Sequence, residues 1–217
     1  MLLLAFDTAT PAVTAAVHDG TAVLAQAFQI DARRHGELLL PAIGRVLAEA
    51  GVDKRRLTAL AVGVGPGPYT GLRVGLVTAA ALGHALGLPV HGVCTLDAIA
   101  HQARAEGVTG PFTVATDARR KEVYWASYDA EGRRVEGPAV DRPGELAVRP
   151  GAVGAGALLY PGTFPEARGP EHVSAGALAD FAVTELAAGR ELLPPRPLYL
   201  RRPDAQVPAG YKAVLPA

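Results

Sequence analysis

Asp7, Thr8 and Thr10 are the first residues in this chain whose types and spacing suggest chemistry. They follow an apolar stretch and form the turn Asp-Thr-Ala-Thr. Carboxylate and hydroxyl oxygens at a turn can bind Mg²⁺ or phosphate. The same residue types also stabilise turns by bonding to nearby backbone amides, and no lysine follows to hold a phosphate. We therefore name the three residues as candidate nucleotide ligands, and we expect Asp7 to act mainly as a structural acceptor of backbone N–H bonds.

A glycine loop at residues 65–71 is the second candidate site. It joins an expected strand to a long helical pattern, an arrangement in which backbone N–H groups can face an anion. A Walker loop needs Lys and Ser or Thr after its last glycine, where this chain has Leu72 and Arg73. A dinucleotide fingerprint needs a glycine at the position of Thr70. We interpret the glycines of this loop primarily as a requirement of the backbone conformation, and only secondarily as a ligand site.

Small residues recur at every fourth position of the following helix: Gly71, Gly75, Ala79, Gly83 and Gly87. Glycine inside a helix costs about 1 kcal/mol relative to alanine, so this stripe predicts close approach of another backbone. That backbone belongs either to the protein's own sheet or to a helix of another chain. Residues 74–96 contain no charged side chain other than histidine. Glycine, histidine and proline interrupt this run, which disfavours a membrane span.

Composition limits the possible functions. The 217 residues are 49% hydrophobic, which indicates a globular protein with one large or two small domains. Equal numbers of basic and acidic residues, 21 each, predict no strong general attraction to nucleic acid or membrane. Arginine clusters are interpreted as solvated surface, with a local RNA patch as the minority alternative. The single cysteine excludes an intrachain disulfide, and no signal peptide is recognisable, so we expect a cytoplasmic protein.

Two similar series of elements follow one another along the chain. The first has strands at 2–7, 12–17, 22–28, 60–64 and 90–94, with helices at 35–50, 69–87 and about 96–104. After a linker at 106–111, strands are expected at 112–116, 122–128 and 133–140, a short helix at 143–147, and a closing helix at 174–188. In this alignment Asp7 corresponds to Asp117, and residues 153–156 repeat the pattern of residues 62–65.

Two halves of this kind predict an α/β protein with the duplicated actin-like ATPase fold (ASKHA, ribonuclease H-like), in which the second half is reduced. The expected division is an N-terminal subdomain at 1–106 and a C-terminal subdomain at 111–217. The latter includes a Pro-rich, irregular tail at 192–217.

Six motifs resemble those of the bacterial TsaB (YeaZ) family and occur in the same order over nearly the full length. They are Asp-Thr-Ala-Thr at 7–10, Arg-His-Gly-Glu-Leu-Leu-Leu-Pro at 34–41, Gly-Pro-Gly-Pro-Tyr-Thr-Gly-Leu-Arg-Val-Gly at 65–75, Asp-Ala-Arg at 117–119, Val-Tyr at 123–124 and Tyr-Leu-Arg at 199–201. The second and third are specific. Gly36 replaces the family's usual serine, and Pro68-Tyr69 replaces its usual Ser-Phe.

The resemblance implies a subunit without independent activity. It implies association with a TsaD-like catalytic subunit, and with a TsaE-like ATPase as third partner, in making N6-threonylcarbamoyladenosine on tRNA next to the anticodon. The chain alone is then expected to bind no cofactor, because partner subunits hold ATP or ADP and the metal. Contact with tRNA is expected to be indirect.

The resemblance also implies association through the two helices at 35–50 and 69–87, in a homodimer when alone and in a heterodimer with the catalytic subunit. The first helix has apolar residues on more than one face, which supports this expectation. The contact residues predicted on these helices are Leu39, Ile43, Val46, Gly71, Gly75, Ala79 and Gly83.

Two enzymatic alternatives stay open. A self-sufficient ATPase or phosphotransferase fits the fold and the turn at Asp7, but the chain lacks a phosphate lysine. The catalytic relatives hold a metal with two histidines four apart, and Thr95 and Ile99 occupy those positions here. A peptidase would need an activated nucleophile; Cys94 has no evident histidine beside it, and no Gly-x-Ser-x-Gly motif occurs.

Overall fold

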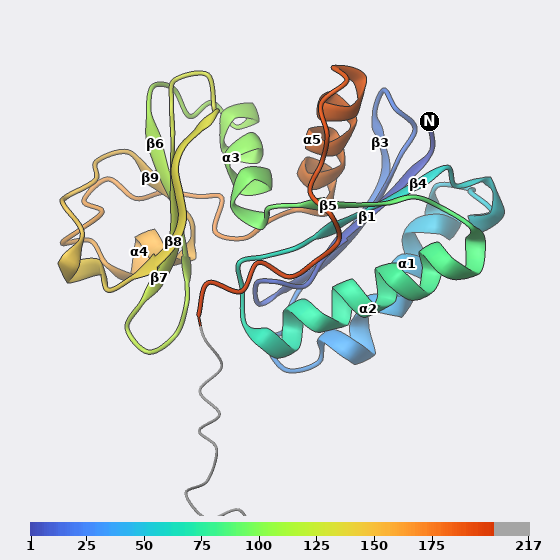
Figure 1. The fold of residues 1–217 in the computed structure, drawn as a ribbon, viewed down its shortest axis with the longest axis horizontal. Helices are drawn as coiled ribbons and strands as arrows, with labels where there is room; N and C mark the ends of the chain where they lie inside the picture. The colour runs from blue at the N-terminus through green and yellow to red at the C-terminus, as the bar shows by residue number, and fades with distance from the viewer. Residues whose placement is uncertain (202–217) are drawn as a thin grey trace, which may run out of the picture.

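The computed structural model describes residues 1–201, which form two β-sheets with helices packed on them (Figure 1). The first sheet has the strand order β3-β2-β1-β4-β5, and the second has the order β8-β7-β6-β9. The strands are β1 Leu3–Asp7, β2 Ala12–His18, β3 Val23–Ile30, β4 Ala59–Gly63, β5 Val90–Val93, β6 Phe112–Asp117, β7 Val123–Tyr128, β8 Arg134–Asp141 and β9 Ala152–Val153.

The helices are α1 His35–Glu49, α2 Tyr69–Leu86, α3 Thr95–Ala105, α4 Ala155–Leu159 and α5 Ala175–Ala187, with short 3₁₀ helices at Lys54–Arg56 and Pro143–Glu145. α2 ends at Gly87, whose φ of 65° lies in the left-handed region that favours glycine. α5 begins after Ser174, whose hydroxyl oxygen accepts a hydrogen bond from the backbone N–H of Ala177 at 3.1 Å. Within residues 1–201, no helix is long and apolar enough to cross a membrane.

The two halves share one topology, as expected for the actin-like fold. β1 pairs antiparallel with β2 and parallel with β4, and β6 pairs in the same way with β7 and β9. In each half a third strand completes the antiparallel part of the sheet: β3 pairs with β2, and β8 pairs with β7. The second half is reduced as predicted: its middle helix is a single 3₁₀ turn at Pro143–Glu145, and α4 has five residues where α2 has 18.

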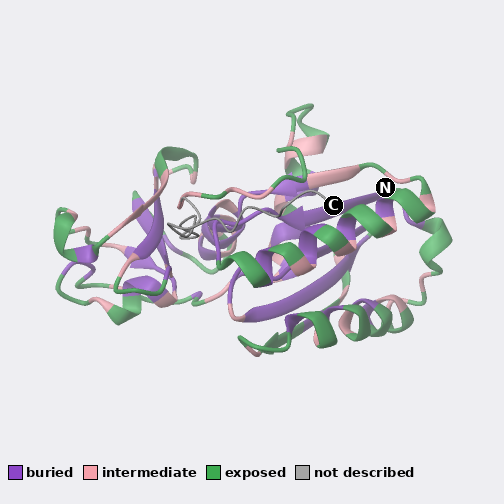
Figure 2. Cartoon of the chain, turned by 60° about the horizontal axis from the view of Figure 1, so that its bottom comes forward, coloured by how far each residue is buried: buried purple, intermediate pink, exposed green. Residues whose placement is uncertain are grey.

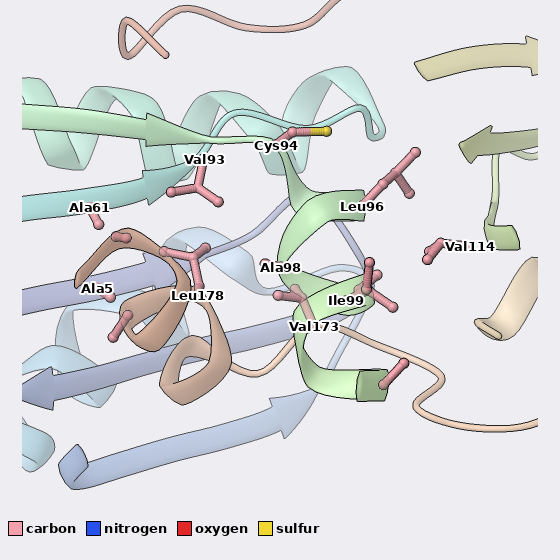
Figure 3. Packing of buried hydrophobic residues seen from close by; sticks show 14 of the residues in the cluster. Ala5, Ala61, Val93, Cys94, Leu96, Ala98, Ile99, Val114, Val173 and Leu178 are labelled. Carbon is pink, nitrogen blue, oxygen red and sulfur yellow. The ribbon is translucent and has the colours of Figure 1, made fainter. Parts of the chain in front are cut away.

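Three groups of apolar side chains form the core. α1 and α2 cover one face of the first sheet, and α4 covers one face of the second. The largest group joins the remaining faces of both sheets through α3 and α5. Figure 3 shows Leu178 of α5 and Ala98 of α3 between Ala5 of the first sheet and Val114 of the second. In Figure 2 most strands are buried, whereas the outward sides of the helices are exposed; the edge strands β3 and β8 are exposed or half-buried along most of their length.

The closing helix of the second half therefore packs on the first sheet. α5 lies against β1, β2 and β3, and its first backbone amide, at Ala175, donates to the hydroxyl of Thr14 on β2 at 2.9 Å. The sequence predicted α5 itself but not this position. Its apolar residues indicate burial and carry no information about which sheet they cover.

Residues 192–201, which we call the C-terminal strap, contain no helix or strand and return to the first sheet. Gly92 and Leu193 exchange backbone hydrogen bonds of 2.7 and 3.1 Å, and the N–H of Leu198 donates to the carbonyl of Val64 at 2.8 Å. The Arg201 side chain then pairs with Glu122 beside the second sheet. The rest of the predicted tail, 202–217, lies outside the described residues. The division into subdomains 1–106 and 111–217 stays a prediction.

Candidate functional site

Asp7 is buried at the end of β1 and has two hydrogen-bond donors. Its Oδ1 accepts the backbone N–H of Ala9 at 2.6 Å, and its Oδ2 accepts the hydroxyl of Thr95 at 2.7 Å. Burial raises the pKa of this carboxyl to about 6, although both hydrogen bonds oppose the rise. The geometry agrees with the predicted role of Asp7 as a structural carboxylate that accepts a backbone N–H bond.

The two threonines of the same turn are also engaged within the chain. The Thr8 hydroxyl donates to the carbonyl of Gly71 at 2.8 Å and accepts the N–H of Gly75 at 2.9 Å. The Thr10 hydroxyl accepts the N–H of Ala12 at 3.2 Å. The three nucleotide candidates thus lie together, as the sequence indicated, but their oxygens bind the protein's own backbone and Thr95.

Glycine is required around this turn because the turn packs directly on the loop and on α2. A Cβ added to Gly63 would overlap the Asp7 carboxylate, and one added to Gly67 would overlap the carbonyl of Ala9. At Gly75 the added Cβ would lie 2.7 Å from the Thr8 hydroxyl. The glycine loop makes room for the strand-end turn, which explains its spacing without a phosphate.

The second half repeats this packing. A Cβ on Gly154 would overlap the carbonyl of Ala115, and one on Gly156 would lie 2.6 Å from the carbonyl carbon of Thr116. The end of β6 therefore rests on the start of α4. Gly154 aligns with Gly63, and each of the two glycines makes room for the first strand of its own half.

The seven predicted interface residues lie in the protein's own core: Leu39, Ile43, Val46, Gly71, Gly75, Ala79 and Gly83. An added Cβ on Gly71 would approach the carbonyl of Thr8 to 2.6 Å, and one on Gly83 would overlap Val90. The stripe thus serves intramolecular packing, the first of the two explanations, and these residues leave little surface for a partner. That a partner contacts them stays a prediction. Contact through the outer sides of α1 and α2 stays a prediction.

A cleft of about 330 Å³ separates the two strand-end turns. Thr10 and Pro11 line it from the first turn, Asp117 and Arg119 from the second, and His172 from the segment before α5. Asp117 and Arg119 form an ion pair at 3.2 Å, and burial lowers the pKa of His172. This cleft is large enough for a small polar ligand. The alignment of Asp7 with Asp117 pointed to the two turns, whereas nothing in the sequence pointed to His172.

The positions of the metal pair in the catalytic relatives have structural roles here. Thr95 accepts the N–H of Gly65 at 3.2 Å in addition to its bond with Asp7, and Ile99 is fully buried in the core. Within residues 1–201, no three His, Cys, Asp or Glu side chains are grouped so that they could hold a metal ion.

Cys94 is buried at the start of α3, and burial raises the pKa of its thiol to about 12. The nucleophile in thiol chemistry is the thiolate. Cys94 therefore stays protonated near neutral pH, which argues against the peptidase alternative.

Fold and site together define an actin-like protein whose strand-end turn binds its own glycine loop. A family model described as TsaD, tRNA N6-adenosine threonylcarbamoyltransferase, matches residues 27–161. YeaZ from Pseudomonas aeruginosa superposes with a TM-score of 0.79 at 31% identity, covering 92% of this chain and 99% of that chain. The chain belongs to the TsaB (YeaZ) family.

Relatives in sequence agree with this assignment. An uncharacterized protein of Mycobacterium tuberculosis (strain H37Rv) is 46% identical over 209 residues, which cover 94% of this chain and 93% of that protein. The tRNA threonylcarbamoyladenosine biosynthesis protein TsaB of Escherichia coli (strain K12) is 37% identical over 131 residues. That match covers 60% of this chain and only 56% of the Escherichia coli protein.

Proposed function

We propose that this protein is a non-catalytic partner subunit of a TsaD-like catalytic subunit, and that it supports formation of N6-threonylcarbamoyladenosine on tRNA next to the anticodon. Membership of the TsaB family supports this role, since relatives at 29–37% identity carry the name tRNA threonylcarbamoyladenosine biosynthesis protein. The proposal includes a TsaE-like ATPase as the third partner. It places this protein in the cytoplasm.

The observation that carries the proposal is the engagement of the turn at Asp7. In this turn the hydroxyls of Thr8 and Thr10 and the carboxylate already bind the protein's own atoms. A nucleotide phosphate would have to displace those buried bonds, and each displaced polar group that stays buried would cost about 1–3 kcal/mol. In the proposal, ATP or ADP and the metal are therefore held by the partner subunits.

The outer sides of α1 and α2 are the proposed partner surface. Leu40 is 58% exposed and Val77 is 66% exposed, although both are large and apolar. The two helices lie side by side across one face of the first sheet (Figure 1), so their outer sides form one surface. A patch of this kind supports association, as a homodimer in isolation and as a heterodimer with the catalytic subunit.

Reconstitution tests the proposal. A TsaD-like and a TsaE-like subunit are incubated with tRNA, ATP and a threonylcarbamoyl donor, with and without this chain, and modified adenosine is measured after digestion of the tRNA. We expect modification only when this chain is present. Equal modification in its absence would refute the partner role.

A self-sufficient ATPase or phosphotransferase is the second candidate, favoured by the 330 Å³ cleft between the two turns. Its test is ATP hydrolysis by the purified chain with Mg²⁺. The proposal expects no hydrolysis above background, and the same result for Asp7→Asn. Hydrolysis that Asp7→Asn abolishes, in a variant that still folds, would support the ATPase instead.

A further inference from the structure

An exposed cluster of two tyrosines and one arginine joins the start of α2 to the C-terminal strap. We call Tyr69, Arg73 and Tyr199 the aromatic cluster. The tyrosine rings stack with their centroids 5.3 Å apart and an interplanar angle of 27°. The Arg73 guanidinium carbon lies 3.8 Å from the centre of the Tyr69 ring, and its Nε donates to the Tyr199 hydroxyl at 3.2 Å.

The cluster is not part of the core. Tyr69 is 50% exposed and Tyr199 is 45% exposed. Aromatic rings that lie on the surface but are held by stacking and by a hydrogen bond lose little conformational freedom when a ligand covers them. The cluster is thus preorganised to stack against a flat ligand.

Basic residues lie near the cluster, and two of them are paired: Arg119 with Asp117 and Arg201 with Glu122. In the part of the chain that the structure describes, no carboxylate forms an ion pair with Arg73, Arg33 or Lys121. The Arg201 side chain, two residues after Tyr199, donates to the backbone carbonyl of Arg119 at 3.4 Å. This bond brings the basic loop of residues 119–121 next to the strap.

A cavity of about 280 Å³ opens beside the cluster. Its lining includes Arg33, Arg119 and His35, together with Thr70 and Val74 from the same turns of α2 that carry Tyr69 and Arg73. No Asp or Glu lines it. Arg33 in its wall has no carboxylate partner among the described residues, whereas Arg119 is paired with Asp117. A groove lined by arginine and by no acidic side chain suits a phosphodiester backbone, and the adjacent rings suit its bases.

We propose that this surface binds single-stranded RNA directly, in place of the indirect contact with tRNA that the sequence led us to expect. Tyr199 stacks on an unpaired base, and Arg73, Arg33 and Lys121 contact phosphates. Stacking requires a base outside a duplex, and arginine and aromatic side chains provide it without reading sequence. This inference deepens the proposed function: that the RNA is tRNA rests on the proposed function. That this chain binds RNA at all does not depend on it, and the chain alone can be tested for it.

The test is fluorescence anisotropy with the full chain and a labelled RNA of about 12 nucleotides, as a single strand and as a duplex, at about 50 and 200 mM salt. We expect the single strand to bind about tenfold more tightly than the duplex. Tyr199→Ala should weaken binding about tenfold, whereas Tyr199→Phe, which keeps the ring and loses only the hydrogen bond from Arg73, should bind within about threefold of the wild type. Arg73→Gln should weaken binding. It should also reduce the slope of log affinity against log salt concentration by about one, the value expected for the loss of one phosphate contact.

Arg56→Gln is the matched control, because Arg56 is an exposed arginine that has no aromatic partner among the described residues. It should leave affinity unchanged. Equal affinity for strand and duplex, or wild-type affinity in Tyr199→Ala, would overturn the proposal. So would competition by polyglutamate as strong as that by RNA, because it would indicate an acidic protein as the ligand. The melting temperature of each variant is measured so that unfolded protein is not scored as loss of binding.

Assembly with the TsaD-like subunit is measured separately by gel filtration. Assembly without RNA binding by this chain overturns only the present inference. RNA binding by a chain that neither assembles with the catalytic subunit nor supports modification overturns only the proposed function.

Discussion

The hydroxyl of Thr95 donates a 2.7 Å hydrogen bond to the Oδ2 atom of Asp7 and so joins the first residue of α3 to the last residue of β1. The same hydroxyl oxygen accepts the N–H of Gly65, the first residue of the glycine loop. One buried side chain thus connects the strand-end turn, the loop and α3. The resemblance to the TsaD-like catalytic subunit implies a metal-binding histidine at the position of Thr95 there.

Burial of Asp7 predicts a specific dependence of stability on pH. Its pKa is about 6 in the folded protein, compared with 3.8 for the ordinary side chain. Because folding favours the protonated form, the contribution of Asp7 is most favourable below pH 3.8 and is lost as the pH rises through 6. The full change is about 3 kcal/mol at about 1.4 kcal/mol per unit.

Asp7→Asn should remove this contribution to the pH dependence, since asparagine does not titrate. Free energies of unfolding from urea titrations at pH 4 and pH 7 measure the effect. Glu49→Gln is the control, because Glu49 is exposed and its carboxylate lies 3.7 Å from Arg45. If Asp7→Asn keeps the wild-type difference between the two pH values, Asp7 is not the titrating group.

Two glycines inside helices should respond to alanine in opposite ways. At Gly75 in α2 an added Cβ would lie 2.7 Å from the Thr8 hydroxyl, and that hydroxyl accepts the N–H of Gly75. Gly75→Ala should therefore destabilise the protein by about 2 kcal/mol. Gly44 in α1 has no atom within 4 Å of an added Cβ, so Gly44→Ala should stabilise by about 1 kcal/mol. Thermal or urea unfolding measures both; a neutral Gly75→Ala would refute the packing explanation of the stripe.

The strap should contribute to stability through Leu198, which is partly buried against apolar groups on both faces of the first sheet. Leu198→Ala should cost about 2 kcal/mol, the low end for burial of this kind. Leu159→Ala is the control at a leucine that is 57% exposed, and we expect a change within about 0.5 kcal/mol. Equal unfolding free energies for the two variants would mean that the strap packs only loosely.

A charge on the outer side of α2 should prevent association. Val77→Glu places a carboxylate in the proposed partner surface, and a buried unpaired charge strongly opposes association. Val135→Glu is matched, because Val135 on β8 is also 66% exposed and lies on the other sheet. Light scattering of the isolated chain and gel filtration with the TsaD-like subunit report both kinds of assembly. Association of Val77→Glu at wild-type affinity would exclude this surface.

The sequence predicted the order of most elements because strands and helices differ in their period of apolar residues. It did not predict β9 and α4, which have two and five residues and are too short to show a period. It also predicted that Asp7 accepts a backbone N–H. The stripe of small residues on α2 predicted that another backbone packs closely against it. It did not predict whether that backbone belongs to the same chain, because periodicity contains no information on the packing partner. The stack of Tyr69 on Tyr199 joins residues far apart in the chain and leaves no local signal. The position of His172 in the cleft is likewise set only by the tertiary fold.

The position of α5 has a consequence for biosynthesis. The chain emerges from the ribosome with its N-terminus first, so β1–β5 emerge long before Ala175–Ala187. Until then, Leu3, Ala5 and Ala61 on one face of the first sheet lack the helix that buries them. The first half of the protein therefore completes its core among the last steps of folding. A nascent chain arrested before residue 175 would expose an apolar face of the first sheet to which chaperones can bind.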